Sequence, residues 1–172
     1  KPYYYKNYQK VLFENQLLKS IKGRSRFQSI LLSSLMLRFS YLKEHYRILG
    51  NLRLNLNETD FLNIALAFFK KSDLPIEIID NHYFEEIPVY VFKIDVSIDI
   101  SKEEEQNYVF EKTEKLLEFG TEKVIWIFTK NRKIIVAEPN KSWTIDNWDK
   151  EIEVLSERFV LEDFLRTEEI IR

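Results

Sequence analysis

Three polar side chains stand on segments that the sequence predicts to be packed, and together they could support metal chemistry. Asn63 interrupts the apolar run of residues 61–69, Asp95 lies in the alternating segment 92–101, and Lys112 lies on the apolar stripe of the next helix. A buried polar group costs about 1–3 kcal/mol unless it finds a partner. We therefore expect these three side chains to meet one another, water or a metal ion.

An oxygen-rich site of this kind suits phosphodiester hydrolysis assisted by Mg²⁺. Carboxylate and amide oxygens are hard ligands that favour Mg²⁺, Mn²⁺ or Ca²⁺ over softer metals. The bound metal lowers the pKa of a water molecule and screens the charge that builds on the phosphate. A nearby lysine positions the attacking water or stabilises the developing oxyanion.

Each of these residues also has a purely structural interpretation. Asn63 could be a core asparagine with a hydrogen-bond partner, and Lys112 could extend along its helix to reach water. Asp95, with Lys93 and Asp99, could form the solvated face of a half-exposed strand. Lys93 precedes Asp95 by two residues on the same face, so it could replace Lys112 as the basic partner or simply pair with Asp95.

Composition excludes several other kinds of site. The 172 residues include no cysteine, which rules out thiol catalysis and disulfides, and only two histidines, which disfavours a serine triad or a multi-histidine metal site. No apolar run approaches the roughly 20 residues of a membrane span, so we expect a cytoplasmic protein without membrane contact.

The net charge of −2 conceals an asymmetry. Residues 1–53 hold eleven Lys or Arg and two acids, which gives +9, and residues 54–172 hold the remaining fifteen bases and twenty-six acids, which gives −11. The basic third, including Arg38, Lys43 and Arg47 on the predicted first helix, indicates a phosphate-facing surface. The alternative is that the two halves neutralise each other in the fold.

The predicted elements form one α/β (α+β) domain over residues 1–172, with a mixed central sheet flanked by helices and an N-terminal arm of about residues 1–15. Apolar periodicity predicts helices at 26–49 with Ser25 as N-cap, at 101–120 with Ser101 as N-cap and Gly120 as C-cap, and from 160 onward. Clear strands are predicted at 50–57, 61–69, 92–101, 123–128 and 133–138, and weaker ones at 16–21, 76–79, 142–148 and 152–155.

Three stretches resemble the PD-(D/E)XK nucleases, and within them the restriction endonuclease family of the Uma-two type. They are LRLNLNETDFLNIALAFF, VFKIDVSIDIS and EKTEKLLEFGTEKVIWIFTKNRKIIVAEP, and the resemblance covers about residues 16–165. The Pro-Asp pair of that family falls on Leu62–Asn63, its glutamate on Asp95, its lysine on Lys112 and its tyrosine on Leu116.

The resemblance implies a restriction-endonuclease-like core with a catalytic site at Asn63, Asp95 and Lys112. Asp95 would be the main ligand of Mg²⁺ or Mn²⁺, Asn63 the second ligand, and Lys112 the residue that positions water or stabilises charge. DNA would be the substrate. Because an amide replaces one carboxylate, we expect weak or lost cleavage.

Two further expectations follow. The alternative function is a catalytically inactive nucleic-acid-binding or protein-interaction module on the same fold. Nucleases of this fold often form homodimers, and the N-terminal cluster of Tyr3, Tyr4, Tyr5 and Tyr8 is typical of a contact surface, so we expect a homodimer.

Overall fold

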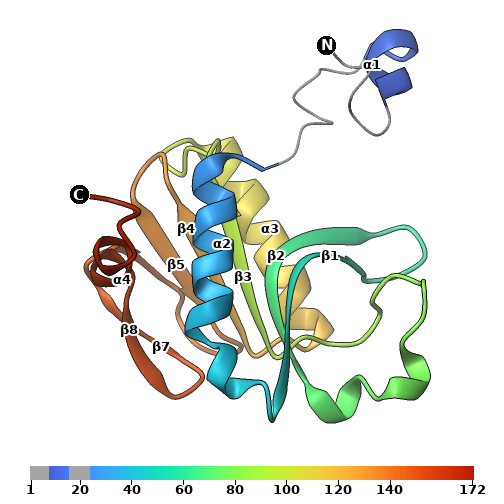
Figure 1. Cartoon of the computed structure of the whole chain (residues 1–172). Helices are drawn as coiled ribbons and strands as arrows, with labels where there is room; N and C mark the ends of the chain where they lie inside the picture. Colours follow the sequence, from blue (N-terminus) through green and yellow to red (C-terminus); the bar gives the residue numbers. More distant parts are fainter. Residues whose placement is uncertain (1–7, 16–23) are drawn as a thin grey trace.

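A computed structural model describes residues 8–15 and 24–172 and confirms a mixed α/β architecture (Figure 1). Six strands form one sheet in the order β1-β2-β3-β4-β5-β6, and β7 and β8 form a separate two-stranded ribbon. Only the β3–β4 pair is parallel. The strands are β1 (Tyr46–Asn55), β2 (Phe61–Lys70), β3 (Tyr90–Asp95), β4 (Lys123–Phe128), β5 (Lys133–Ala137), β6 (Thr144–Asn147), β7 (Glu151–Val154) and β8 (Glu157–Val160).

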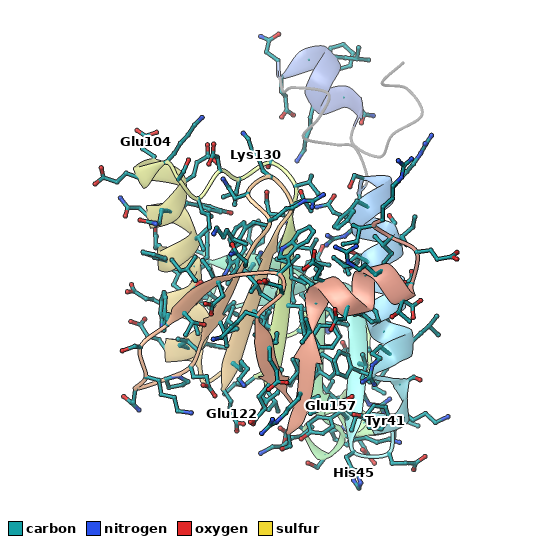
Figure 2. The ribbon with its side chains drawn as sticks, turned by 90° about the vertical axis from the view of Figure 1, so that its left-hand side faces the viewer. Tyr41, His45, Glu104, Glu122, Lys130 and Glu157 are labelled. Carbon is teal, nitrogen blue, oxygen red and sulfur yellow. The ribbon has the colours of Figure 1, made fainter. Side chains whose placement is uncertain are left out.

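Two helices cover opposite faces of the sheet and begin at the same end of it. Figures 1 and 2 show α2 on one face, α3 on the other, and the carboxyl end of β3 at the end where both helices start. The ribbon β7–β8 and α4 pack on the same face as α2. The helices are α1 (Tyr8–Phe13), α2 (Arg26–Arg38), α3 (Glu103–Phe119) and α4 (Leu161–Thr167), with short 3-10 turns η3 (Ser40–Leu42), η4 (Lys71–Asp73) and η5 (Ile76–Ile78).

The ends of the two long helices follow local chemistry. Ser25 caps α2 as predicted: its Oγ accepts from the Gln28 backbone N–H, and the Gln28 side chain accepts from the Ser25 backbone N–H. Three glutamates occupy the first turn of α3, where the helix dipole favours them. Gly120 ends α3 at φ 120°, as predicted, but the N-cap is Lys102 and not Ser101.

Three predicted elements are wrong, and one strand was missed. The helix predicted over 26–49 ends at Arg38, because Tyr46–Asn55 forms a ten-residue strand paired along β2, and this ladder overrides the helical periodicity. The strand predicted at 76–79 is a 3-10 turn. The predicted strand 92–101 stops at Asp95, and β8 was not predicted. The strand predicted at 16–21 lies outside the described residues.

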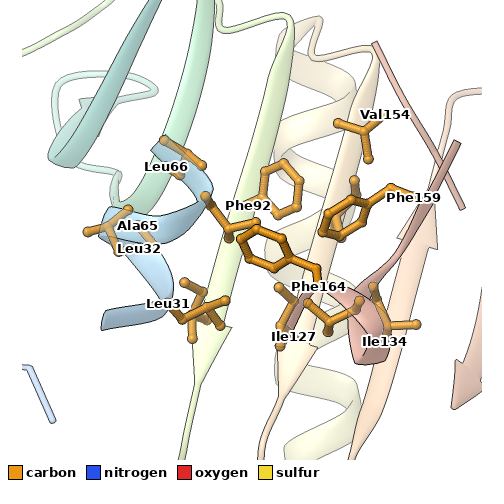
Figure 3. Packing of buried hydrophobic residues seen from close by; sticks show 14 of the residues in the cluster. Leu31, Leu32, Ala65, Leu66, Phe92, Ile127, Ile134, Val154, Phe159 and Phe164 are labelled. Carbon is orange, nitrogen blue, oxygen red and sulfur yellow. The ribbon is translucent and has the colours of Figure 1, made fainter. Parts of the chain in front are cut away.

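Two apolar clusters hold the layers together. On the α2 face, one buried cluster includes Phe92 from β3 together with Phe159 and Phe164 from the β8–α4 segment (Figure 3). On the α3 face, the rings of Trp126 and Phe128 stack at 5.5 Å, and the indole N–H of Trp126 donates to the buried Thr113 hydroxyl at 2.8 Å. Within the described residues, no helix combines the length and the apolar character needed to cross a membrane.

Phe39→Ala tests the α2-face cluster. Phe39 is fully buried, with its ring 5.6 Å from that of Phe68 and 5.9 Å from that of Phe159. We expect the variant to lose about 3–5 kcal/mol of unfolding free energy, because the vacated space cannot close completely. Urea unfolding measures the loss. Leu37→Ala, at a side chain that is 75% exposed, is the control and should change stability by no more than about 0.5 kcal/mol. Equal effects at both positions would contradict the packing described.

Candidate functional site

The candidate site lies where β2 and β3 separate. These strands pair only from Phe68–Tyr90 to Leu66–Phe92, whereas β3 and β4 remain paired as far as Asp95. The Lys93 side chain spans the opening, and its ammonium donates to the backbone carbonyl of Asn63 at 2.6 Å. A cavity of about 60 Å³ lies here, lined by Arg24, Asn63, Ala65, Lys93, Ile94, Asp95, Tyr108 and Trp126.

The Asp95 carboxylate accepts the hydrogen bonds of the turn that ends β3. Its Oδ1 accepts the backbone N–H of Ser97 at 2.7 Å, the Ser97 hydroxyl at 3.1 Å and the backbone N–H of Ile98 at 2.6 Å. Side-chain bonds of this pattern compete with strand pairing and turn the chain. Asp95 therefore stabilises the turn after β3, in addition to any chemical role. This turn explains why the alternating pattern of 92–101 does not continue as a strand.

Lys93 lines the cavity in an environment that is unfavourable for a charge. Burial lowers the pKa of Lys93 to about 8, the Asp95 carboxylate acts in the opposite direction, and the charges of Arg24 and Lys112 lower it further. The ammonium also lies 5.1 Å from the centre of the Trp126 ring, which provides a weak cation–π contact. At pH 7 the side chain is mostly protonated and partly sheltered from water.

The predicted site residues come together only in part. Asn63 and Asp95 line the same cavity, but Asn63 is exposed and not buried, and its backbone carbonyl receives the Lys93 bond. Lys112 does not line the cavity, and its ammonium lies 5.6 Å from the centre of the Tyr108 ring.

The reason lies in the rotation of α3. Its buried stripe is Val109, Thr113 and Leu116, so the stripe predicted through Tyr108 and Lys112 is displaced to the flank of the helix. Lys93, which the sequence offered as the alternative basic partner of Asp95, takes the position expected for Lys112.

Arg24 is the site residue that the sequence did not indicate. It lines the cavity from the residue before the α2 cap, and its guanidinium donates to the Asn51 side-chain oxygen. Burial lowers the pKa of Arg24, which nevertheless stays charged. One arginine in a basic stretch gives no distinguishing pattern, and Arg24 approaches Asn51 only because β1 folds back beside α2.

The basic face predicted on the first helix does not form from Arg38, Lys43 and Arg47. Arg38 makes an ion pair with Glu157, Lys43 follows the η3 turn, and the Arg47 guanidinium donates to the Leu74 carbonyl from β1. Tyr41 and His45, which neighbour Lys43 in the chain, lie at the end of the molecule opposite Glu104 and Lys130 (Figure 2). Those three cations therefore do not surround the Lys93 cavity.

The cavity does not fit a divalent metal ion. It contains one carboxylate, already bonded to three donors through Oδ1, and two cations, Arg24 and Lys93. Across residues 8–15 and 24–172, no group of three His, Asp or Glu side chains is arranged to hold a metal. The two cations in the lining make it less favourable for a divalent cation than the resembled pattern, which includes a single lysine.

Comparison with known proteins supports a nuclease-like fold. The structure is similar to a crystal structure described as a "putative nuclease belonging to DUF820" from Anabaena variabilis ATCC 29413, with a TM-score of 0.64, 17% sequence identity and 86% of each chain covered. At this identity the likeness concerns the fold alone. No protein-family model matches the sequence, and no curated protein matches it.

The pKa of Lys93 predicts how stability depends on pH. Between about pH 8 and 10.5 the folded chain releases the Lys93 proton before the unfolded chain does, so the unfolding free energy rises with pH in this window. Lys93→Met removes this contribution. We expect the wild type to gain stability relative to the variant from pH 8 to pH 10, measured by urea unfolding at each pH. A difference that stays constant with pH would show that Lys93 titrates normally.

Proposed function

We propose that this chain is a nucleic-acid-binding module that retains a nuclease-like fold without metal-dependent cleavage. The observation that carries the proposal is the Lys93 ammonium beside Asp95, inside the opening between β2 and β3. The resemblance to PD-(D/E)XK nucleases would assign the two metal-binding carboxylates to Asn63 and Asp95, which line this opening. Here Asn63 supplies an amide in place of one carboxylate, and Arg24 adds a second cation beside the lysine.

The charge of the cavity favours a phosphate group. Arg24 and Lys93 contribute +2 and Asp95 contributes −1, so the lining carries a net +1 at neutral pH. The volume of about 60 Å³ corresponds to about two water molecules, at ~30 Å³ each. A phosphate oxygen fits such a space, while a base or a sugar ring does not. Lys93 and Arg24 would then bind a phosphate directly, as basic side chains commonly do in nucleic-acid complexes.

The same groups leave hydrolysis without a complete set of participants. A water attacking a phosphodiester needs a group that removes its proton and a charge that stabilises the transition state. Lys93 and Arg24 can supply the charge. The Oδ1 of Asp95 is bonded to three donors of the following turn, which leaves its Oδ2 as the one carboxylate oxygen of the lining that could accept a proton, without a metal ion to activate the water. His45 and His82 do not line the cavity. We therefore expect binding without turnover.

Binding in the absence of metal tests the proposal. We expect fluorescently labelled DNA to bind in the presence of EDTA, and Lys93→Met to weaken binding about ten-fold or more, since one charge-assisted hydrogen bond contributes about 1.5–3 kcal/mol. Lys43→Met is the matched control, because it removes the same charge at an exposed position outside the cavity. Fluorescence anisotropy reports the affinity. Wild-type binding that disappears with EDTA, or DNA cleavage with Mg²⁺ or Mn²⁺ at stoichiometric protein, would overturn the proposal.

A double substitution tests why a metal is disfavoured. We expect Mn²⁺ to leave the melting temperature of the wild type and of Asn63→Asp unchanged, because both retain the Lys93 ammonium. Asn63→Asp combined with Lys93→Glu surrounds the cavity with carboxylates. We expect Mn²⁺ at 100 times its Kd to stabilise this variant by about 2.7 kcal/mol, or several degrees. Excess EDTA should reverse the shift. A Mn²⁺ shift in the wild type would contradict the assignment.

A further inference from the structure

A groove of about 500 Å³ adjoins the Lys93 cavity and shares two residues with it. Arg24 and Asn63 line both spaces, so the groove and the cavity are contiguous. The groove passes from the start of α2 across β1 and β2 to the loop before β3. Its polar and aromatic lining consists of Arg24, Gln28, Asn51, Arg53, Asn63 and Tyr83.

The chemistry of this lining suits a polyanion with polar bases. It contains two arginines, three side-chain amides and no carboxylate. A neighbouring hollow of about 660 Å³ also contains Tyr83 but has the opposite character, because four acids line it together with Arg47 and His82. A phosphate chain would be attracted by the first space and repelled by the second. Tyr83 stands at the boundary between the two.

Arg53 forms the centre of an aromatic platform in the groove. Its guanidinium carbon lies 3.7 Å from the centre of the Phe61 ring and 4.5 Å from the centre of the Tyr83 ring, and its Nε donates to the Asn55 side-chain oxygen at 3.1 Å. The β1–β2 register places Arg53 opposite Asn63. Within the described residues, no carboxylate makes an ion pair with Arg53.

The two rings of the platform remain open to solvent. Phe61 is 45% exposed and Tyr83 is 58% exposed, although each has one face near Arg53. A planar cation between two exposed rings, next to a basic cavity, combines the features that bind unpaired bases: charge for the phosphates and flat faces for stacking. In a duplex the base faces are already stacked, so they cannot use the platform.

We propose that this groove binds a single-stranded segment of nucleic acid. One phosphate lies at Lys93 and Arg24, the next phosphates follow toward Arg53, and an unpaired base stacks on the exposed face of Tyr83. This inference rests on the proposed function and deepens it by naming the class of nucleic acid. Because every base has a flat face, the groove should show little sequence preference.

The test compares a labelled twelve-nucleotide single strand with a duplex of the same sequence, in EDTA, by fluorescence anisotropy. We expect the wild type to bind the single strand more tightly than the duplex. Tyr83→Ala and Arg53→Met should each weaken single-strand binding about ten-fold, as loss of one stacked base does. Tyr83→Phe, which keeps the ring, should bind like the wild type. Tyr41→Ala removes a similarly exposed ring that does not line the groove and should have no effect.

The outcomes separate this inference from the proposed function. If duplex and single strand bind equally, and Tyr83→Ala has no effect while Lys93→Met weakens both, the platform is structural and only this inference fails. If neither nucleic acid binds the wild type, both proposals fail. Melting curves show whether each variant is folded, and Tyr83→Phe keeps the test valid should Tyr83→Ala prove unstable. Weak binding by Tyr83→Phe as well as Tyr83→Ala would also contradict stacking.

Discussion

The arrangement of the candidate site depends on the hydrogen bond from Lys93 to the Asn63 carbonyl. It joins β2 and β3 at the place where their own pairing has ended, so a side chain bridges a sheet that the backbone leaves open. The backbone of β3 does not pair with β2 at Asn63, so a side chain from β3 is the group that reaches its carbonyl. The lysine donates to this carbonyl, and in doing so places a positive charge in the cavity that Asn63 and Asp95 both line.

The other parts of the site are arranged around that charge. Asp95 lies two residues further along β3, and its negative charge partly offsets the lowering of the Lys93 pKa that burial causes. The same carboxylate fixes the turn after β3 through three hydrogen bonds, so the turn and the charge balance depend on one residue. Arg24 adds a second cation from the start of α2. A site of this composition is suited to hold an anion in place, and it lacks the crowded carboxylates that draw a metal out of water.

The sequence predicted the sheet and its flanking helices well, because these depend on local patterns. The capping box at Ser25, the alternation of Leu52 and Leu54, and the glycine at the end of α3 are all visible over a few residues. The end of α2 was not predictable in this way, since Tyr46–Asn55 becomes a strand only by pairing with β2. Arg24 was missed for the same reason: its position depends on how distant segments fold together. Lys112 was misplaced because a rotation of α3 by about one residue moves a side chain from the buried stripe to the flank, and apolar spacing does not resolve so small a rotation.

The replacements at this site form a consistent pair when their charges are counted. In the pattern that the sequence resembles, two carboxylates, a divalent cation and one lysine sum to +1. Here Asp95, Lys93 and Arg24 also sum to +1, while Asn63 is neutral. An isolated change of the first carboxylate to an amide would leave a weakened metal site, whereas a second fixed cation, Arg24, beside the lysine supplies positive charge without a metal. A fixed ammonium can still bind a phosphate, but it brings no water molecule of lowered pKa. Under the proposed function, the pair of changes removes the metal-activated nucleophile and retains the anion site, which is what a module that holds nucleic acid without cutting it requires.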